Sequence, residues 1–188
     1  DRMVMDQLHI PLKDLGSYDV GYGFGSYFYV IGQAVGMAQG PIMADMWFQN
    51  TLNSKLRIRS LVFMMQVVFL SAGFLFAIWA QNIMALLYNN SAFSGSYTFA
   101  AVVFMSYVYF PMYWGAINKL FYAEKTTQLW KISFIAGVSN VLLNLIFVPI
   151  YGPMAAAIST FVCLMYLGFS GYFLKSYKML GDVNYYPI

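Results

Sequence analysis

The sequence contains few charged residues. Only 9% of the 188 residues are Asp, Glu, Lys or Arg, whereas soluble domains carry about 25%. None of these four residue types occurs in 20–44, in 60–118 or in 132–174. So few charges cannot cover a water-facing surface, and a membrane-spanning helix needs about 20 apolar residues. The composition therefore argues against an ordinary soluble domain and predicts a membrane protein.

Cysteine and histidine are nearly absent, with Cys163 and His9 as the only examples. A single cysteine cannot form an internal disulfide, and a lone histidine offers no metal-ligand spacing. The sequence shows no pairing of a nucleophile with a base, and its net charge of +3 is too small to indicate nucleic-acid binding. We therefore expect a protein that is not an enzyme, without metal, cofactor or nucleic-acid partner.

The long apolar runs predict an all-α polytopic membrane protein. Five transmembrane helices are expected, at about 18–44, 60–87, 97–118, 132–148 and 153–174. The second run breaks at the polar stretch 89–96, and the third breaks at 149–153. The whole chain, 1–188, is then part of one transmembrane domain with no soluble domain.

Basic residues are concentrated in alternate loops. Eight of the ten Lys and Arg residues lie in 55–59, in 119–131 or after 174, and none lies in 88–96 or 149–152. The positive-inside rule places the basic loops in the cytoplasm. Residue 1 is then outside and residue 188 cytoplasmic. An odd number of spans that starts outside predicts a fragment of a larger protein.

Glycines recur at helical spacing in the first predicted span. Gly32, Gly36 and Gly40 are four residues apart, and Gly21 and Gly25 fall on a similar stripe. Small residues one turn apart let two helices approach closely in lipid. The stripe indicates either simple helix packing or a sliding surface in a moving bundle.

The third predicted span is rich in tyrosine around Pro111. Proline in a span removes a backbone donor and frees the carbonyl of Tyr107, which must be satisfied inside the protein. Tyr107 and Tyr113 could stack on sugar rings or could be ordinary packing residues. Lys119 could reach lipid headgroups or could meet a phosphate at the mouth of a cavity.

Two asparagines lie one helical turn apart in the fourth predicted span. Asn140 and Asn144 share one face, and an amide without partners in hydrocarbon costs several kcal/mol. They should therefore face neighbouring helices or a water-filled interior. We expect Pro149 to end this span, Gly152 to make the turn and Pro153 to begin the next span.

At this stretch the sequence resembles a known family. The resemblance rests on Glu124-Lys-Thr126, Asn140, Asn144, Pro149, Gly152 and Ala156-Ala157, supported by Asp1-Arg2, "VGYGF" at 20–24 and 185–188. These features are similar to the lipid-linked oligosaccharide flippases for O-antigen and capsule repeat units. That family belongs to the multidrug, oligosaccharidyl-lipid and polysaccharide exporter superfamily. Ala155 departs from the family pattern, which tends to have glycine there.

The resemblance implies the second half of a 12- to 14-helix transporter with two bundles and alternating access. The expected substrate is an undecaprenyl-pyrophosphate-linked repeat unit, flipped across the bacterial inner membrane, for O-antigen, lipopolysaccharide or capsule synthesis. Besides membrane lipids, a polysaccharide polymerase and a chain-length regulator are expected partners. The candidate cavity residues are Gln33, Gln39, Gln66, Tyr107, Tyr113, Asn118, Lys119, Asn140 and Asn144.

No Asp, Glu or His lies deep in a predicted span, although proton relays in transporters usually use such residues. We therefore expect any coupling group to lie in the N-terminal half of a larger protein. A multidrug and toxin extrusion exporter is the first alternative, and it should show an acidic residue deep in the bundle. A membrane-embedded polymerase or glycosyltransferase, or a purely structural subunit, is a weaker alternative.

Overall fold

The computed structural model describes residues 1–88 and 95–180, and all regular structure in these residues is helical. The helices are α1 (Arg2–Gln7), α2 (Leu12–Gln49), α3 (Leu52–Leu87), α4 (Tyr97–Tyr107), α5 (Phe110–Tyr122), the short 3₁₀ helix η2 (Thr126–Gln128), α6 (Leu129–Tyr151), α7 (Pro153–Phe173) and α8 (Lys175–Met179). Most of the predicted polar break at 89–96 and the family-like segment 185–188 lie outside the described residues.

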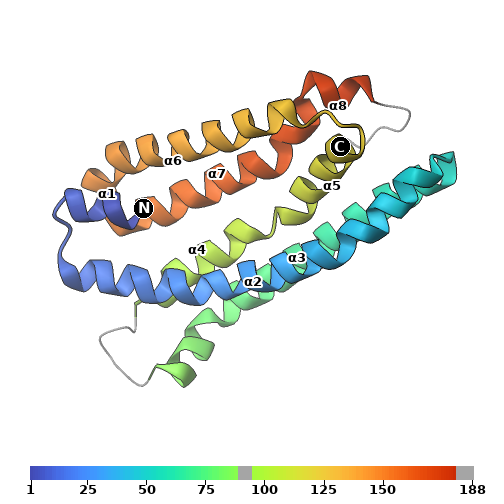
Figure 1. The fold of residues 1–188 in the computed structure, drawn as a ribbon. Helices are drawn as coiled ribbons and strands as arrows, with labels where there is room; N and C mark the ends of the chain where they lie inside the picture. Colours follow the sequence, from blue (N-terminus) through green and yellow to red (C-terminus); the bar gives the residue numbers. More distant parts are fainter. Residues whose placement is uncertain (89–94, 181–188) are drawn as a thin grey trace.

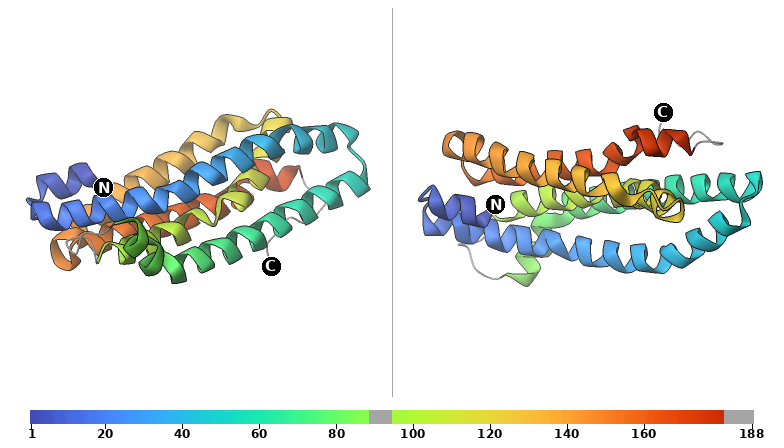
Figure 2. Two further views of the ribbon diagram at one scale, coloured as in Figure 1. Left: turned by 90° about the horizontal axis from the view of Figure 1, so that it is seen from below. Right: turned by 45° about the horizontal axis from the view of Figure 1, so that its top comes forward.

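The long helices form one elongated bundle (Figure 1). Helices α6 and α7 pair as a hairpin, and α4 followed by α5 packs against α2, α3 and α7. The end that holds α1 also holds the α6–α7 turn, while the α2–α3 turn, η2 and α8 lie toward the other end (Figures 1 and 2). The basic segments and the uncharged α6–α7 turn therefore lie at opposite ends of the bundle.

Four helical segments in the described residues are long and apolar enough to cross a membrane. They are Leu52–Leu87, Tyr97–Tyr122, Thr126–Tyr151 and Pro153–Met179. These segments indicate an all-α, membrane-embedded protein. Helix α2 has 38 residues and covers the predicted span 18–44, but it is not one of the four, because glycine, tyrosine and glutamine lower its hydropathy. The count of five spans stays a prediction.

The apolar segment Tyr97–Tyr122 is interrupted in its middle. Helix α4 ends at Tyr107 and α5 begins at Phe110, so the break precedes Pro111, which lies in the first turn of α5. Gln66 on α3 donates from Nε2 to the carbonyl of Val108 at 2.9 Å. The expected break near Pro111 is present, and a neighbouring helix satisfies a carbonyl at this point, as a low-dielectric environment requires.

The α6–α7 hairpin turns at one residue. Gly152 has φ 69° and ψ −164°, a conformation that is essentially restricted to glycine. Pro153 begins α7, as expected. Pro149 does not end the helix: α6 continues through it to Tyr151, because proline lacks only one donor near a helix end and φ remains helical.

The glycine stripe of α2 lies against α4 and α5 over most of its length. A Cβ built at Gly25 would lie 2.6 Å from Val103, and one at Gly36 would lie 2.7 Å from the Trp114 ring. Gly40 has no neighbour within 4 Å of such a Cβ. The stripe is therefore a packing surface whose last glycine takes no part.

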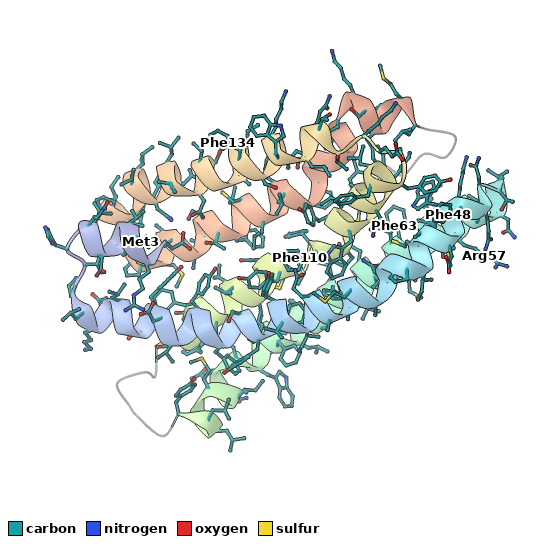
Figure 3. The ribbon with its side chains drawn as sticks, viewed as in Figure 1. Met3, Phe48, Arg57, Phe63, Phe110 and Phe134 are labelled. Atoms are coloured by element: carbon teal, nitrogen blue, oxygen red, sulfur yellow. The ribbon has the colours of Figure 1, made fainter. Side chains whose placement is uncertain are left out.

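Apolar side chains cover much of the outside as well as the core. Phe134 on α6 points away from the bundle and is 61% exposed, whereas Phe110 is buried between α5 and α2 (Figure 3). Arg57 lies near the end of the bundle where α2 meets α3 (Figure 3). An apolar exterior with a charged end is the surface that a lipid environment selects.

Candidate functional site

A cavity of about 600 Å³ is lined by residues of α2, α4, α5, α6 and α7 together with Asp1. Its lining residues are Asp1, Tyr22, Tyr29, Gln33, Tyr107, Phe110, Tyr113, Ser133, Ala136, Gly137, Asn140, Thr160, Cys163, Leu164 and Leu167. The volume falls within the range of small-molecule sites, about 300–1,000 Å³. We refer to this space as the tyrosine cavity.

One wall of the tyrosine cavity is aromatic. The ring centroids of Tyr29 and Tyr107 are 5.4 Å apart, and those of Tyr107 and Phe110 are 5.5 Å apart. The hydroxyls of Tyr22 and Tyr107 are within hydrogen-bond distance at 3.3 Å. The break between α4 and α5 brings Tyr107 and Phe110 to the same surface. The wall offers ring faces for stacking and hydroxyls at their edges.

The opposite wall is mixed, because α6 and α7 contribute the polar side chains of Ser133, Asn140 and Thr160 beside apolar ones. Asn140 Nδ2 lies 3.4 Å from the hydroxyls of both Ser159 and Thr160. Asn144 donates from Nδ2 to Asn140 Oδ1 at 3.2 Å, and Ser159 Oγ donates to Asn144 Oδ1. The two asparagines thus join the helices of the hairpin, and Asn140 also faces the cavity.

The carboxylate of Asp1 completes this network. Its Oδ1 accepts from Asn144 at 2.6 Å. Its Oδ2 accepts from Thr160 at 2.7 Å and from the Tyr18 hydroxyl at 3.0 Å. All three donors are uncharged. The arrangement holds the carboxylate in place by hydrogen bonds from uncharged groups.

The position of Asp1 differs from what the sequence indicated. Asn144 and Thr160 each lie eight residues from Gly152, so the carboxylate lies about 12 Å from the hairpin turn, at 1.5 Å per residue. The carboxylate therefore lies along the length of the hairpin helices and not at the turn itself. Counting charges within predicted spans missed this acid because Asp1 enters the bundle from outside any long apolar run.

Four of the nine candidate residues line the tyrosine cavity: Gln33, Tyr107, Tyr113 and Asn140. Asn144 lies behind Asn140, fully buried in the network with Asp1. Gln66 donates a hydrogen bond to the carbonyl of Val108 at the α4–α5 break. Gln39 is buried, and neither its amide nitrogen nor its amide oxygen has a hydrogen-bond partner. Neither Gln66 nor Gln39 is among the residues that line the tyrosine cavity.

Two candidates near the end of α5 lie away from the cavity. Asn118 donates to the sulfur of Met43 at 3.3 Å. Lys119 is only 3% exposed, and its ammonium lies 4.2 Å from the ring centroid of Tyr177 on α8. The expected contact of Lys119 with lipid headgroups or with a cavity-bound phosphate does not fit this buried position.

Sequence reasoning missed several lining residues that share helical spacing. On α2, Tyr22 and Tyr29 are seven residues apart, and the candidate Gln33 lies four residues further on. The three side chains therefore lie on one face of the helix. On α7, Thr160, Cys163 and Leu167 also share a face. This spacing is present in the sequence. On α2 the glycine stripe runs along the same helix, and local sequence does not indicate which face of a helix points into the bundle.

No cluster of three His, Cys, Asp or Glu residues occurs in the described parts of the chain, 1–88 and 95–180. Asp1 and Cys163 both line the cavity, yet the other polar groups there are amides and hydroxyls. These are hard oxygen and nitrogen groups, which suit hydrogen bonding and proton or alkali-cation binding rather than a transition-metal centre.

Comparisons with known proteins add no relative to this description. No family model, no curated protein and no solved structure matches the chain. The resemblance to oligosaccharide flippases therefore rests on the residues quoted for it, and function must be argued from the cavity.

Proposed function

We propose that the chain belongs to a membrane transporter that flips lipid-linked oligosaccharide repeat units by alternating access. The observation that carries this proposal is the tyrosine cavity: a space lined by four tyrosines, amides and hydroxyls inside an apolar bundle. Aromatic faces stack on sugar rings, and neutral polar groups match sugar hydroxyls. A purely structural helical bundle would be expected to fill such a space with packed side chains.

The outside of the bundle suits the lipid part of this substrate. A groove of about 560 Å³ between α3, α4 and α7 is lined by apolar side chains that include Phe74, Met105 and Phe161. A second groove of about 550 Å³ lies along α6 and α7, with Phe147 and Tyr151 among its lining residues. A polyprenyl tail can remain on such surfaces while the sugars enter the cavity.

The pyrophosphate needs cations, and the exposed lysines at one end of the bundle supply them. Lys125, Lys131, Lys175 and Lys178 are exposed near η2 and α8, the end expected to face the cytoplasm. Lys119 is buried beneath Tyr177, so we do not assign it this role. We assign substrate capture to these surface lysines and sugar recognition to the tyrosine cavity.

The Asp1 network provides a place for energy coupling within the chain itself. A carboxylate held by Asn144, Thr160 and Tyr18 can exchange a proton or an alkali cation. Either event changes the charge between α6 and α7 at the cavity wall, and intramembrane acids commonly act in this way in transporters. This proposal replaces the expectation that coupling lies wholly in another part of a larger protein.

A drug exporter of the multidrug and toxin extrusion type is the second candidate. The position of Asp1 in a cavity lined by four tyrosines favours it, because an acid and aromatic rings together bind organic cations. The oligosaccharide flippase ranks first because the ordered resemblance along the chain points to that family. The two candidate functions differ in whether lipid-linked repeat units accumulate when the protein is lost.

The deciding experiment depletes the intact protein in its host and measures lipid-linked repeat units by mass spectrometry, with surface polysaccharide in parallel. The flippase proposal predicts accumulated full-length repeat units and lost surface polymer. Complementation with Tyr107→Ala should restore at most a tenth of the polymer, whereas Tyr27→Ala, on an exposed face of α2, should restore it fully. Unchanged lipid-linked pools would instead favour the drug exporter.

A further inference from the structure

One residue in the α6 wall of the tyrosine cavity carries no side chain. Gly137 lies inside α6, is exposed and lines the cavity. A Cβ built on Gly137 would have no neighbour within 4 Å. Ser133, one turn before it, and Asn140, one turn after it, line the cavity from the same face of the helix. Between these two polar residues the cavity therefore extends to the backbone of α6.

Neither backbone conformation nor helix packing accounts for this glycine. Among the glycines of the described residues only Gly152 has a positive φ, so the backbone at Gly137 suits any L-residue. Gly25 and Gly36 serve packing, since a Cβ on them would lie 2.6 Å and 2.7 Å from neighbouring side chains. Glycine inside a helix is less stable than alanine. Gly137 thus lowers the stability of α6, and what it provides in this structure is space.

The space beside Gly137 is continuous with the aromatic wall. Tyr29, Tyr107 and Phe110 line the same cavity of about 600 Å³, and their ring centroids lie 5.4 to 5.6 Å apart. A cavity of this volume accommodates a ligand of drug size, and a disaccharide is such a ligand. A side chain at position 137 would enter this volume, because the position faces the cavity and its Cβ is unobstructed.

We infer that Gly137 is a specificity-determining residue of the tyrosine cavity, and that its missing side chain makes room for a second sugar ring. This inference rests on the proposed function, because it states how much of the saccharide the same cavity admits. The C–H face of a sugar ring can pack against the bare backbone at Gly137, while Ser133 and Asn140 bind hydroxyl groups. A larger residue at position 137 would restrict the cavity to smaller saccharides and leave both polar groups in place.

The test measures the binding of two neutral glycosides to the intact protein in phospholipid nanodiscs. The probes are methyl β-glucoside and methyl β-cellobioside, which differ by one ring, and saturation-transfer NMR gives their affinities. Gly137→Leu should weaken binding of the cellobioside by about tenfold or more, because the added side chain occupies the space of the second ring. Binding of the glucoside should be almost unchanged. Gly137→Ala should weaken binding of the cellobioside by less than Gly137→Leu does.

The stability of the variants separates this role from a structural one. Both substitutions at position 137 should raise the unfolding midpoint, because alanine and leucine favour a helix more than glycine does and meet no obstructing atom. Gly23→Leu is the matched control, since Gly23 is exposed on α2, has equally open space and does not line the cavity. It should also raise the midpoint, and it should leave the binding of both glycosides unchanged. A packing role for Gly137 predicts instead that its substitution lowers the midpoint.

The outcomes separate this inference from the proposed function. Unchanged binding of the cellobioside by Gly137→Leu, or equal losses for the two glycosides, would overturn the inference and leave the flippase proposal standing. If the unmodified protein binds neither glycoside and Tyr107→Ala is fully active in the host, sugar recognition by this cavity is wrong and the inference fails with it.

Discussion

At the scale of single residues, Asp1 and Asn144 form a hydrogen bond between positions 143 residues apart in the sequence. Asn144 is fully buried and bonds to Asp1, Asn140 and Ser159. An interhelical hydrogen bond in a membrane protein is worth only about 0.6 kcal/mol on average. The network is therefore better explained by the need to hold a partly buried carboxylate than by the stability of the hairpin alone.

Asn144→Ala should lower the free energy of unfolding by about 1–3 kcal/mol, because it leaves the Asp1 carboxylate and the Ser159 hydroxyl short of partners. Asn118→Ala is the matched control, since Asn118 is partly buried and bonds only to a thioether sulfur. Thermal unfolding followed by tryptophan fluorescence in detergent measures both. Equal losses in the two variants would contradict the assigned role of Asn144.

At the scale of helices, the bundle depends on close contact between α2 and the broken pair α4 and α5. Gly25 meets Val103 and Gly36 meets the Trp114 ring. This contact places Tyr29 and Gln33, which lie between these glycines along α2, beside Tyr107. The glycine surface thus positions the aromatic wall as well as packing the bundle.

Gly36→Val should destabilise the fold by about 1–3 kcal/mol, because its side chain would overlap the Trp114 ring and force a shift in packing. Gly40→Val lies one turn further along the same helix, where nothing comes within 4 Å. It should leave stability almost unchanged. Unfolding midpoints in detergent test the pair, and similar losses for both would show that α2 is held by other contacts.

At the scale of the whole molecule, most basic residues lie toward one end of the bundle. Exposed lysines surround η2 and α8, whereas the α6–α7 turn carries no charge. The chain must cross the membrane an odd number of times between Lys13 and Asn53 if α2 is a span. The arrangement in Figure 1 allows this, since the two ends of α2 lie at opposite ends of the bundle.

Single cysteines in a Cys163→Ala background should show this topology with a membrane-impermeant maleimide. Lys13→Cys and Tyr151→Cys should react from outside in intact cells, and Asn53→Cys and Lys125→Cys should react only in inverted vesicles. All four positions are exposed. If Lys13→Cys and Asn53→Cys react from the same side, α2 does not cross the membrane and the five-span prediction is wrong.

The sequence by itself determined the membrane class, the helical segments and the hairpin at Gly152. These features depend on local quantities: hydropathy over about 20 residues and the backbone freedom of one residue. The sequence also identified Tyr107, Tyr113, Gln33 and Asn140, because polar groups in apolar runs need partners.

Only the tertiary structure decided which polar residues share a cavity and which are buried elsewhere. It brings Asp1 within 2.6 Å of Asn144 across 143 positions of sequence, and it turns Lys119 toward Tyr177 instead of the cavity. Helical periodicity defines a face but not the neighbour that the face meets. The contact between distant helices is set by packing of the whole bundle, so the set of residues that lines the cavity could be read only from the fold.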